Sequence, residues 1–185
     1  LGQEGLKIMR KVSDEIGLPI VTEITSTDDL KLFKKYADMI QIGSRNMHNF
    51  DLIKKVAQLG KPILLKRGMA ATMEEFLLAA EYILNEGNPN IVLCERGLRS
   101  FEQSTRNIMD LNTLALIKQE SHLPIIADPS HAAGRYDIVT PLAKAGIAAG
   151  ADGLIIEVHN EPGSALSDGE QSLTFKSFAT LMKQL

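Results

Sequence analysis

Polar side chains that could bind a metal follow two short apolar segments in the second half of the sequence. His131 follows the segment 124–127 within PIIADPSHAAG, and Glu157 lies in GLIIEVH, ahead of Asp168. One imidazole and two carboxylates form a borderline-hard ligand set that suits Mn²⁺, Fe²⁺, Co²⁺ or Zn²⁺. His159, close behind Glu157, is placed to support a ligand through a hydrogen bond. A lone histidine at a strand end is more often structural, so the three residues together predict a divalent metal on His131, Glu157 and Asp168.

Three cationic side chains stand at the ends of other predicted strands. Arg45 lies in IGSRN, Lys66 in LLKRG and Arg96 in CERG. Charged groups are rarely buried unless they are paired or used, and arginine binds two oxygens of a phosphate or carboxylate at once. A structural ion pair explains any one of them equally well, but three on successive strands predict an anion site.

The composition is that of a globular domain with a real core. The chain has 185 residues, of which 44% are hydrophobic and 23% charged, and its net charge is −3. The low aromatic content and the absence of long basic runs argue against a nucleic-acid partner. No apolar stretch approaches the roughly 18 residues of a membrane span, and no secretory signal is visible. The single cysteine, Cys94, fits a reducing compartment, so we expect a cytoplasmic protein without a membrane partner.

Short apolar segments alternate with amphipathic ones along the whole chain. We predict strands at 19–24, 39–43, 63–66, 91–94, 124–127 and 153–158. We predict helices at 5–16, around Leu30, Phe33 and Ala37, around Phe50 to Ala57, at 72–87, 111–120 and 137–149, and around Phe175 to Leu181. Buried strands that alternate with helices are typical of parallel βα units.

Two α/β architectures fit this alternation. An open, doubly wound sheet is one, and a (β/α)₈ TIM barrel, which needs eight strands and typically about 250 residues, is the other. The polar strand ends favour the barrel, because its chemistry collects at the carboxyl ends of the strands. We therefore predict that residues 1–185 form one catalytic barrel domain, N-terminally incomplete, with about six βα units that correspond to strands 3–8. We also expect residues upstream of Leu1 in the native protein.

The joint set of motifs resembles a known family. IQIGSRN, PILLKRG, IVLCERGLRSFE, LPIIADPSHAAGR and IIEVHNEPGSALSDGEQSL are similar, in this order, to motifs of 3-deoxy-7-phosphoheptulonate (DAHP) synthases of the type I beta subgroup. The resemblance runs from about Gly2 to Leu185. It implies a (β/α)₈ barrel that condenses phosphoenolpyruvate with erythrose 4-phosphate and releases phosphate. This is the first step of the shikimate pathway to the aromatic amino acids.

The resemblance also implies roles for individual residues. It implies that His131, Glu157 and Asp168 are three of four metal ligands, with Mn²⁺ the favoured ion, and that Arg45, Lys66 and Arg96 bind phosphoenolpyruvate. The fourth ligand of the family, a cysteine after the first strand, and its KPRT-type loop for erythrose 4-phosphate have no counterpart in this sequence. Cys94 belongs to the CERG strand and is not that ligand. Family members are often dimers or tetramers, so we expect a homo-oligomer, and some carry a chorismate mutase or regulatory domain upstream.

In the implied reaction, C3 of phosphoenolpyruvate attacks the aldehyde, water adds at C2, and phosphate leaves. The metal acts as a Lewis acid on the aldehyde, and Lys66, Glu95 and His131 are all candidates for handling the water. Three other functions stay open at this point. They are a 3-deoxy-manno-octulosonate 8-phosphate synthase, a non-catalytic truncated barrel fragment, and a phosphosugar aldolase with Lys66 as its Schiff-base lysine.

Overall fold

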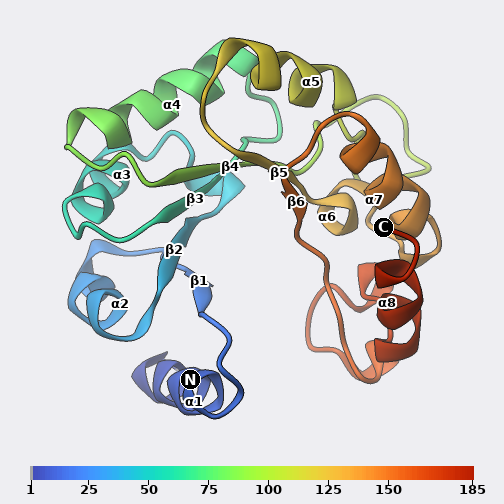
Figure 1. Ribbon diagram of the computed structural model, residues 1–185, viewed down its shortest axis with the longest axis horizontal. Helices are drawn as coiled ribbons and strands as arrows, with labels where there is room; N and C mark the ends of the chain where they lie inside the picture. The colour runs from blue at the N-terminus through green and yellow to red at the C-terminus, as the bar shows by residue number, and fades with distance from the viewer. Residues whose placement is uncertain (1) are drawn as a thin grey trace. The chain divides into compact units, whose positions relative to one another are not determined.

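The computed structural model of the chain describes residues 2–185 and contains the expected alternation of strands and helices (Figure 1). The strands are β1 (Val21–Glu23), β2 (Met39–Ile42), β3 (Ile63–Lys66), β4 (Ile91–Glu95), β5 (Ile125–Ala127) and β6 (Gly153–Leu154). They follow one another in the sheet in chain order, from β1 to β6.

Eight α-helices and five short 3₁₀ helices lie among residues 2–185. The α-helices are α1 (Gly2–Ile16), α2 (Leu30–Tyr36), α3 (Phe50–Ala57), α4 (Met73–Asn85), α5 (Leu111–Glu120), α6 (Pro129–Ala133), α7 (Val139–Ala148) and α8 (Phe175–Met182). The 3₁₀ helices are η1 (Thr27–Asp29), η2 (Ser44–Asn46), η3 (Tyr136–Ile138), η4 (Pro162–Ser164) and η5 (Gly169–Gln171). Among the described residues, no helix has the length and apolar character that a bilayer crossing requires.

The chain divides into two compact units. The first consists of the residues up to Gly68 together with 74–93. Its strands β1, β2 and β3 run parallel, with Val21 opposite Met39 and Ile40 opposite Ile63. All of β3 is buried, as expected of a parallel strand that is covered on both faces. Figure 1 shows α2 and α3 on one side of these strands. The largest buried side chains of this unit include Ile40, Ile42, Leu52, Ile53, Ile63, Leu65, Phe76 and Ile83.

The second unit consists of residues 69–73 and 94–185. Its strands β5 and β6 run parallel, with Ala127 opposite Leu154. Helix α7 contacts both strands. Its buried side chains form a small core with residues from α6, α8 and the segment after η5, namely Ala133, Val139, Ala143, Leu173 and Leu181. This core supports the loops that follow β5 and β6.

An aspartate precedes a strand in each unit and ties it to the neighbouring strand. Asp38, just before β2, accepts a hydrogen bond from the Ile20 backbone N–H at 2.7 Å and pairs with Arg10 at 3.0 Å. Asp152, just before β6, accepts from the Ile125 backbone N–H at 2.8 Å. It also pairs with Lys118, at 2.6 Å. Both aspartates therefore stabilise the amino ends of parallel strands, the opposite ends from those that carry the candidate site residues.

These contacts predict an acid-sensitive component of stability. The Ile20 N–H, aided by Arg10, lowers the pKa of Asp38, and Lys118, aided by the Ile125 N–H, lowers the pKa of Asp152. A carboxylate whose folded pKa is lowered stabilises the fold above its unfolded pKa, here 3.8, and that contribution is lost as the pH falls further. We expect the free energy of unfolding to decline below about pH 4, and to decline less in the Asp38→Asn/Asp152→Asn double variant.

Urea unfolding between about pH 7 and pH 3 measures this difference. Asp28→Asn is the matched control, because Asp28 is exposed and its carboxylate is not used to join strands. The same acid-induced decline in the double variant and in the unchanged protein would contradict the assignment.

The main local difference from the sequence prediction lies after β5. His131 was expected directly after the strand, but it lies in the short helix α6. The Asp128 side chain accepts from the His131 backbone N–H, Pro129 occupies the first turn, and Gly134 ends the helix in a left-handed conformation with φ +69°. These are ordinary signals for a helix start and stop. The motif is so short that it resembles a loop when only its sequence is considered.

One further boundary differs from the predictions. Strand β6 ends at Leu154, whereas the apolar segment predicted a strand to Val158. Val158 instead forms a single parallel bridge with Leu173, so the chain beyond β6 stays extended without a regular partner. The apolar residues Met9 and Val12, which share a face of α1, are exposed in this structure. The other predicted segments agree with the structure to within a few residues at their ends.

Candidate functional site

Helix α6 places His131 and Glu157 close to each other. The buried hydroxyl Oγ of Ser130 accepts a hydrogen bond from the Glu157 backbone N–H at 3.0 Å, which joins α6 to the segment that follows β6. His131 Nε2 then lies 3.4 Å from Glu157 Oε1. His131 Nδ1 lies 2.7 Å from Oδ2 of the buried Asp128. The Asp128 carboxylate therefore lies beside Nδ1 without a well-aligned hydrogen bond to it, and His131 Nε2 faces the Glu157 carboxylate.

Asp168 reaches the same place from the loop that precedes η5. Its backbone is left-handed, with φ +53°, and it is the only residue other than glycine with a positive φ among residues 2–185. The backbone oxygen of Asp168 accepts a hydrogen bond from Ser172 Oγ at 3.0 Å. Its carboxylate pairs with Arg106, whose Nη1 lies 2.9 Å from Oδ1. Left-handed backbone is unfavourable for most residues with a side chain and less so for aspartate, and these contacts help to hold it.

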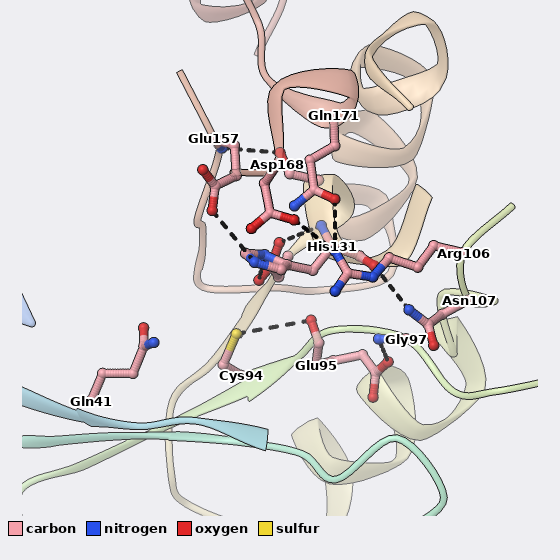
Figure 2. A network of polar contacts seen from close by, with 12 residues as sticks. Gln41, Cys94, Glu95, Gly97, Arg106, Asn107, His131, Glu157, Asp168 and Gln171 are labelled. Atoms are coloured by element: carbon pink, nitrogen blue, oxygen red, sulfur yellow. Dashed lines mark hydrogen bonds and ion pairs between the residues drawn. The ribbon is translucent and has the colours of Figure 1, made fainter. Parts of the chain in front are cut away.

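His131, Glu157 and Asp168 form one cluster of potential ligands (Figure 2). One ligand atom from each lies within 4.8 Å of the others. Within the described part of the chain, this is the group of three or more His, Cys, Asp or Glu side chains that lie this close together. The imidazole and the two carboxylates are the donor types that first-row divalent metals accept. A carboxylate such as Asp128 behind a ligating histidine fixes the ring and its tautomer in metal sites. The residues present thus fit a divalent metal.

Arg96 is a buried cation with donors that lack partners. Arg96 is 3% exposed, and its Nε and Nη1 atoms have no hydrogen-bond partner among residues 2–185. Burial lowers the pKa of Arg96 below its usual value, an effect that Asp128 opposes and Arg106 reinforces. Buried donors without partners carry a free-energy penalty that a bound acceptor removes. Arg96 is therefore suited to bind an anion through two guanidinium nitrogens.

Glu95 is completely buried, and its carboxylate is engaged by backbone donors. Oε1 accepts from the Gly97 N–H at 2.6 Å and lies 3.4 Å from the Asp110 N–H. These bonds hold together both ends of the long loop between β4 and α5. The geometry favours a structural role for Glu95, and its participation in catalysis stays a prediction.

The whole chain resembles known proteins in sequence and in structure. Residues 1–185 match the DAHP synthetase I family. The chain belongs to this family. The predicted resemblance to DAHP synthases is thereby confirmed.

Individual relatives agree with the family assignment. A phospho-2-dehydro-3-deoxyheptonate aldolase of Thermotoga maritima is 54% identical over 185 residues, which are 100% of this chain and 55% of that protein. The crystal structure of the Thermotoga maritima aldolase, described as a DAHP synthase, matches with a TM-score of 0.98 over 100% of this chain and 54% of that chain. A truncated 3-deoxy-D-arabino-heptulosonate 7-phosphate synthase from the same organism gives a TM-score of 0.98 and is covered to 70%. A 2-dehydro-3-deoxyphosphooctonate aldolase of Acidithiobacillus ferrooxidans is 31% identical over 98% of this chain and 68% of that protein.

These matches show the fold of the chain and how much of its relatives the chain covers. The chain spans about half the length of the Thermotoga maritima relative. The strand order β1 to β6 and the match to the truncated synthase confirm the prediction of part of a (β/α)₈ barrel. In a doubly wound sheet the strand order reverses at a switch point, which this sheet lacks, so that alternative is wrong.

The other two cationic residues predicted to bind an anion, Arg45 and Lys66, belong to the first unit. Lys66 is the last residue of β3 and is buried, whereas Arg45 is exposed in η2. The carboxyl ends of β1 and β2 are closely packed. Gln41 Nε2 donates to Glu23 Oε2 at 3.0 Å, and a Cβ at Gly43 would collide with the Glu23 carboxylate. Because Arg96 belongs to the second unit, the convergence of the three cations stays a prediction.

Several residues near the ligand cluster were given no role from the sequence. Asp128, Ser130, Arg106 and Asn107 contact a ligand residue or its helix, and Gln171 contacts Arg106; Figure 2 shows Arg106, Asn107 and Gln171. Asp128 could have been found, because Asp followed by Pro is a typical helix start. The contacts of Arg106 and Gln171 join distant parts of the chain, so no local sequence pattern indicates them. His159, a predicted supporter of the ligands, instead accepts from the Glu161 backbone N–H at 3.0 Å through Nδ1.

Proposed function

We propose that the protein carrying this chain is a DAHP synthase, which condenses phosphoenolpyruvate with erythrose 4-phosphate to give 3-deoxy-D-arabino-heptulosonate 7-phosphate and phosphate. The cluster of His131, Glu157 and Asp168 is the observation that carries the proposal. These residues follow β5 and β6, at the carboxyl ends of strands, where barrel enzymes place their chemistry. The 54% identity with the Thermotoga maritima relative over the whole chain supports the same reaction.

His131, Glu157 and Asp168 are the proposed ligands of a divalent metal. The donor set favours Mn²⁺, with Fe²⁺, Co²⁺ or Zn²⁺ as alternatives. A metal bound there supplies Lewis-acid polarisation of the aldehyde of erythrose 4-phosphate. We propose that Asp128, whose Oδ2 lies 2.7 Å from Nδ1, holds the His131 ring when the metal is bound, with Nε2 directed at the cluster.

Arg96 is the proposed main contact of phosphoenolpyruvate, assisted by Arg45 and Lys66. Its buried guanidinium has two donors to offer to phosphate or carboxylate oxygens, and a charge-assisted pair in a buried site is strong. Phosphoenolpyruvate carries both groups close together, so several cations are needed to neutralise it. Holding the substrate in this way orients its C3 atom for attack and lowers the entropic barrier.

The proposed reaction balances without a covalent enzyme intermediate. C3 of phosphoenolpyruvate forms the new bond to the aldehyde carbon, water adds at C2, and C2 then expels phosphate. All atoms of the two substrates and of water are recovered in the two products. Lys66 is our candidate for the proton movements, because this proposal already uses His131 as a metal ligand. Glu95, which two backbone N–H groups engage, is assigned the task of holding the loop that carries Arg96.

The wider setting is proposed from the family. We propose that the protein acts at the start of the shikimate pathway in the cytoplasm, as a homo-oligomer, with small phosphorylated substrates as its partners. We propose neither a nucleic-acid nor a membrane partner. An associated chorismate mutase domain is compatible with this setting, because it belongs to the same route to aromatic amino acids.

The second candidate is the synthase that extends arabinose 5-phosphate. The Acidithiobacillus ferrooxidans relative, a 2-dehydro-3-deoxyphosphooctonate aldolase, supports it with 31% identity across nearly the whole chain. That identity is well below the 54% shared with the Thermotoga maritima relative, so erythrose 4-phosphate is the favoured substrate.

Phosphate release by the full-length native protein tests the proposal. With phosphoenolpyruvate and Mn²⁺, we expect faster release with erythrose 4-phosphate than with arabinose 5-phosphate, and EDTA should suppress release until Mn²⁺ is restored. Preference for arabinose 5-phosphate would establish the second candidate instead. Covalent trapping of a sugar phosphate on Lys66 by borohydride would indicate a Schiff-base aldolase. No release with either sugar would leave a non-catalytic barrel.

A further inference from the structure

Arg106 contacts both ends of the turn that carries Asp168. It lies in the long loop between β4 and α5, and its Nη1 donates to Asp168 Oδ1 at 2.9 Å and to Gln171 Oε1 at 3.0 Å (Figure 2). Asp168 precedes η5 and Gln171 ends it. One guanidinium nitrogen therefore joins the two ends of η5. Gln171 is buried, so its side chain holds the Arg106 guanidinium in place.

The same loop segment also holds the helix that carries His131. The Arg106 backbone N–H donates to the Ala133 oxygen at 3.0 Å, and the Asn107 N–H donates to the Ala132 oxygen at 2.9 Å. Asn107 Nδ2 donates to the His131 oxygen at 3.0 Å. The carbonyl groups at the end of α6, which lack partners inside the helix, are thus satisfied by this segment. Residues 106–107 connect the helix of one proposed ligand to the carboxylate of another.

The backbone around Arg106 is shaped for this contact. Gly134, which ends α6, has φ +69°, and a Cβ at this position would collide with the Arg106 side chain. Asp168 has a left-handed backbone that is unfavourable for a residue with a Cβ. The Arg106 pair helps to keep the carboxylate in this conformation. Without it, we expect the Asp168 loop to relax and the carboxylate to leave the cluster for part of the time.

We propose that Arg106 is a positioning residue of the metal centre, which acts by holding the Asp168 carboxylate in its ligating place. This inference rests on the proposed metal site. A carboxylate has two oxygens, so the hydrogen bond from Arg106 to Oδ1 leaves Oδ2 for a cation. Hydrogen-bonded partners of ligating carboxylates commonly raise metal affinity, and their loss costs about 10- to 100-fold.

A competing effect has the opposite sign. A guanidinium next to a ligand also repels an incoming dication, and this repulsion alone would make Arg106 lower the metal affinity. The side chains of Arg106 and Asp168 are 42% and 34% exposed, so solvent screens the repulsion. Solvent also weakens the Arg106–Asp168 pair, but the same guanidinium nitrogen is bonded to the buried Gln171, which keeps it in place beside Asp168. We therefore expect positioning to dominate.

Direct Mn²⁺ binding to the full-length native protein tests this inference, with free Mn²⁺ followed by its electron paramagnetic resonance signal. We expect Arg106→Met to weaken binding by about 10- to 100-fold, and Arg106→Lys, which keeps a charged donor, to recover most of the loss. Arg135→Met is the matched control. Arg135 lines the same polar hollow of about 610 Å³, but it pairs with Asp137 at 2.6 Å, so its loss should leave Mn²⁺ affinity unchanged.

The possible outcomes separate the inference from the proposed function. Unchanged or tighter Mn²⁺ binding in a folded Arg106→Met variant would overturn the role of Arg106 and leave the metal centre intact. An equal loss in Arg135→Met would reduce the effect to a general one of surface charge and would also overturn it. Circular dichroism shows whether Arg106→Met is folded. If it is not, the Mn²⁺ affinity of Arg106→Lys decides whether Arg106 has this role. An affinity below that of the unchanged protein and above that of His131→Ala supports the role. Failure of the unchanged protein to bind Mn²⁺ would instead refute the proposed metal centre.

Discussion

Replacing His131 by alanine is expected to abolish tight binding of Mn²⁺ and, with it, metal-dependent release of phosphate from phosphoenolpyruvate. His131 is the only nitrogen ligand in the cluster of His131, Glu157 and Asp168. The loss should exceed the about 10- to 100-fold that removal of an outer partner of a ligand costs. Mn²⁺ titration and phosphate release, both on the full-length native protein, measure the two effects separately.

His122→Ala is the matched control for this variant. His122 is exposed, just before β5, and lies outside the ligand cluster, so its removal should change neither Mn²⁺ binding nor turnover. Circular dichroism verifies that His131→Ala is folded. A near-normal rate in a folded His131→Ala protein would remove His131 from the metal site.

Replacing Arg96 by methionine is expected to weaken phosphoenolpyruvate binding strongly while leaving the unliganded protein at least as stable. Methionine fills much of the volume of the arginine stem and removes the buried charge and the two donors that have no partner. Loss of one partner from a buried charge pair costs about 2–5 kcal/mol of binding free energy. Replacing a poorly compensated buried ion by an apolar side chain is often neutral or stabilising.

Thermal unfolding with and without phosphoenolpyruvate measures both effects at once. The substrate should raise the melting temperature of the unchanged protein and have little effect on Arg96→Met. Arg99→Met is the control, because Arg99 is exposed on the same loop. Equal stabilisation of the unchanged and Arg96→Met proteins by phosphoenolpyruvate would show that Arg96 is not its ligand.

The elements of the barrel could be predicted because each strand is a short apolar run flanked by polar residues. The boundaries of β3 and α5 were predicted to the residue, since apolar periodicity and flanking polar residues agree there. Helix α6 was missed because a single helical turn has no periodicity to detect. Strand β6 was predicted too long, because the apolar run to Val158 continues after regular pairing has ended.

The ligand cluster could be predicted in part for a physical reason. Carboxyl ends of parallel strands meet at one edge of a sheet, so His131 and Glu157 were expected together as soon as β5 and β6 were placed next to each other. Asp168 lies in an irregular loop, so no strand end placed it; it was predicted as a ligand because a second carboxylate completes the donor set, and the family resemblance agreed. Arg106 could not be predicted at all, since its contact with Asp168 joins residues 62 positions apart.

Anomalous diffraction from crystals of the full-length native protein grown with Mn²⁺ is the most direct test of the proposed metal centre. The account predicts a single strong manganese peak within coordination distance, about 2.0–2.3 Å, of His131 Nε2 and of one carboxylate oxygen each from Glu157 and Asp168. A manganese peak elsewhere, with these three side chains bonded only to protein groups, would contradict it.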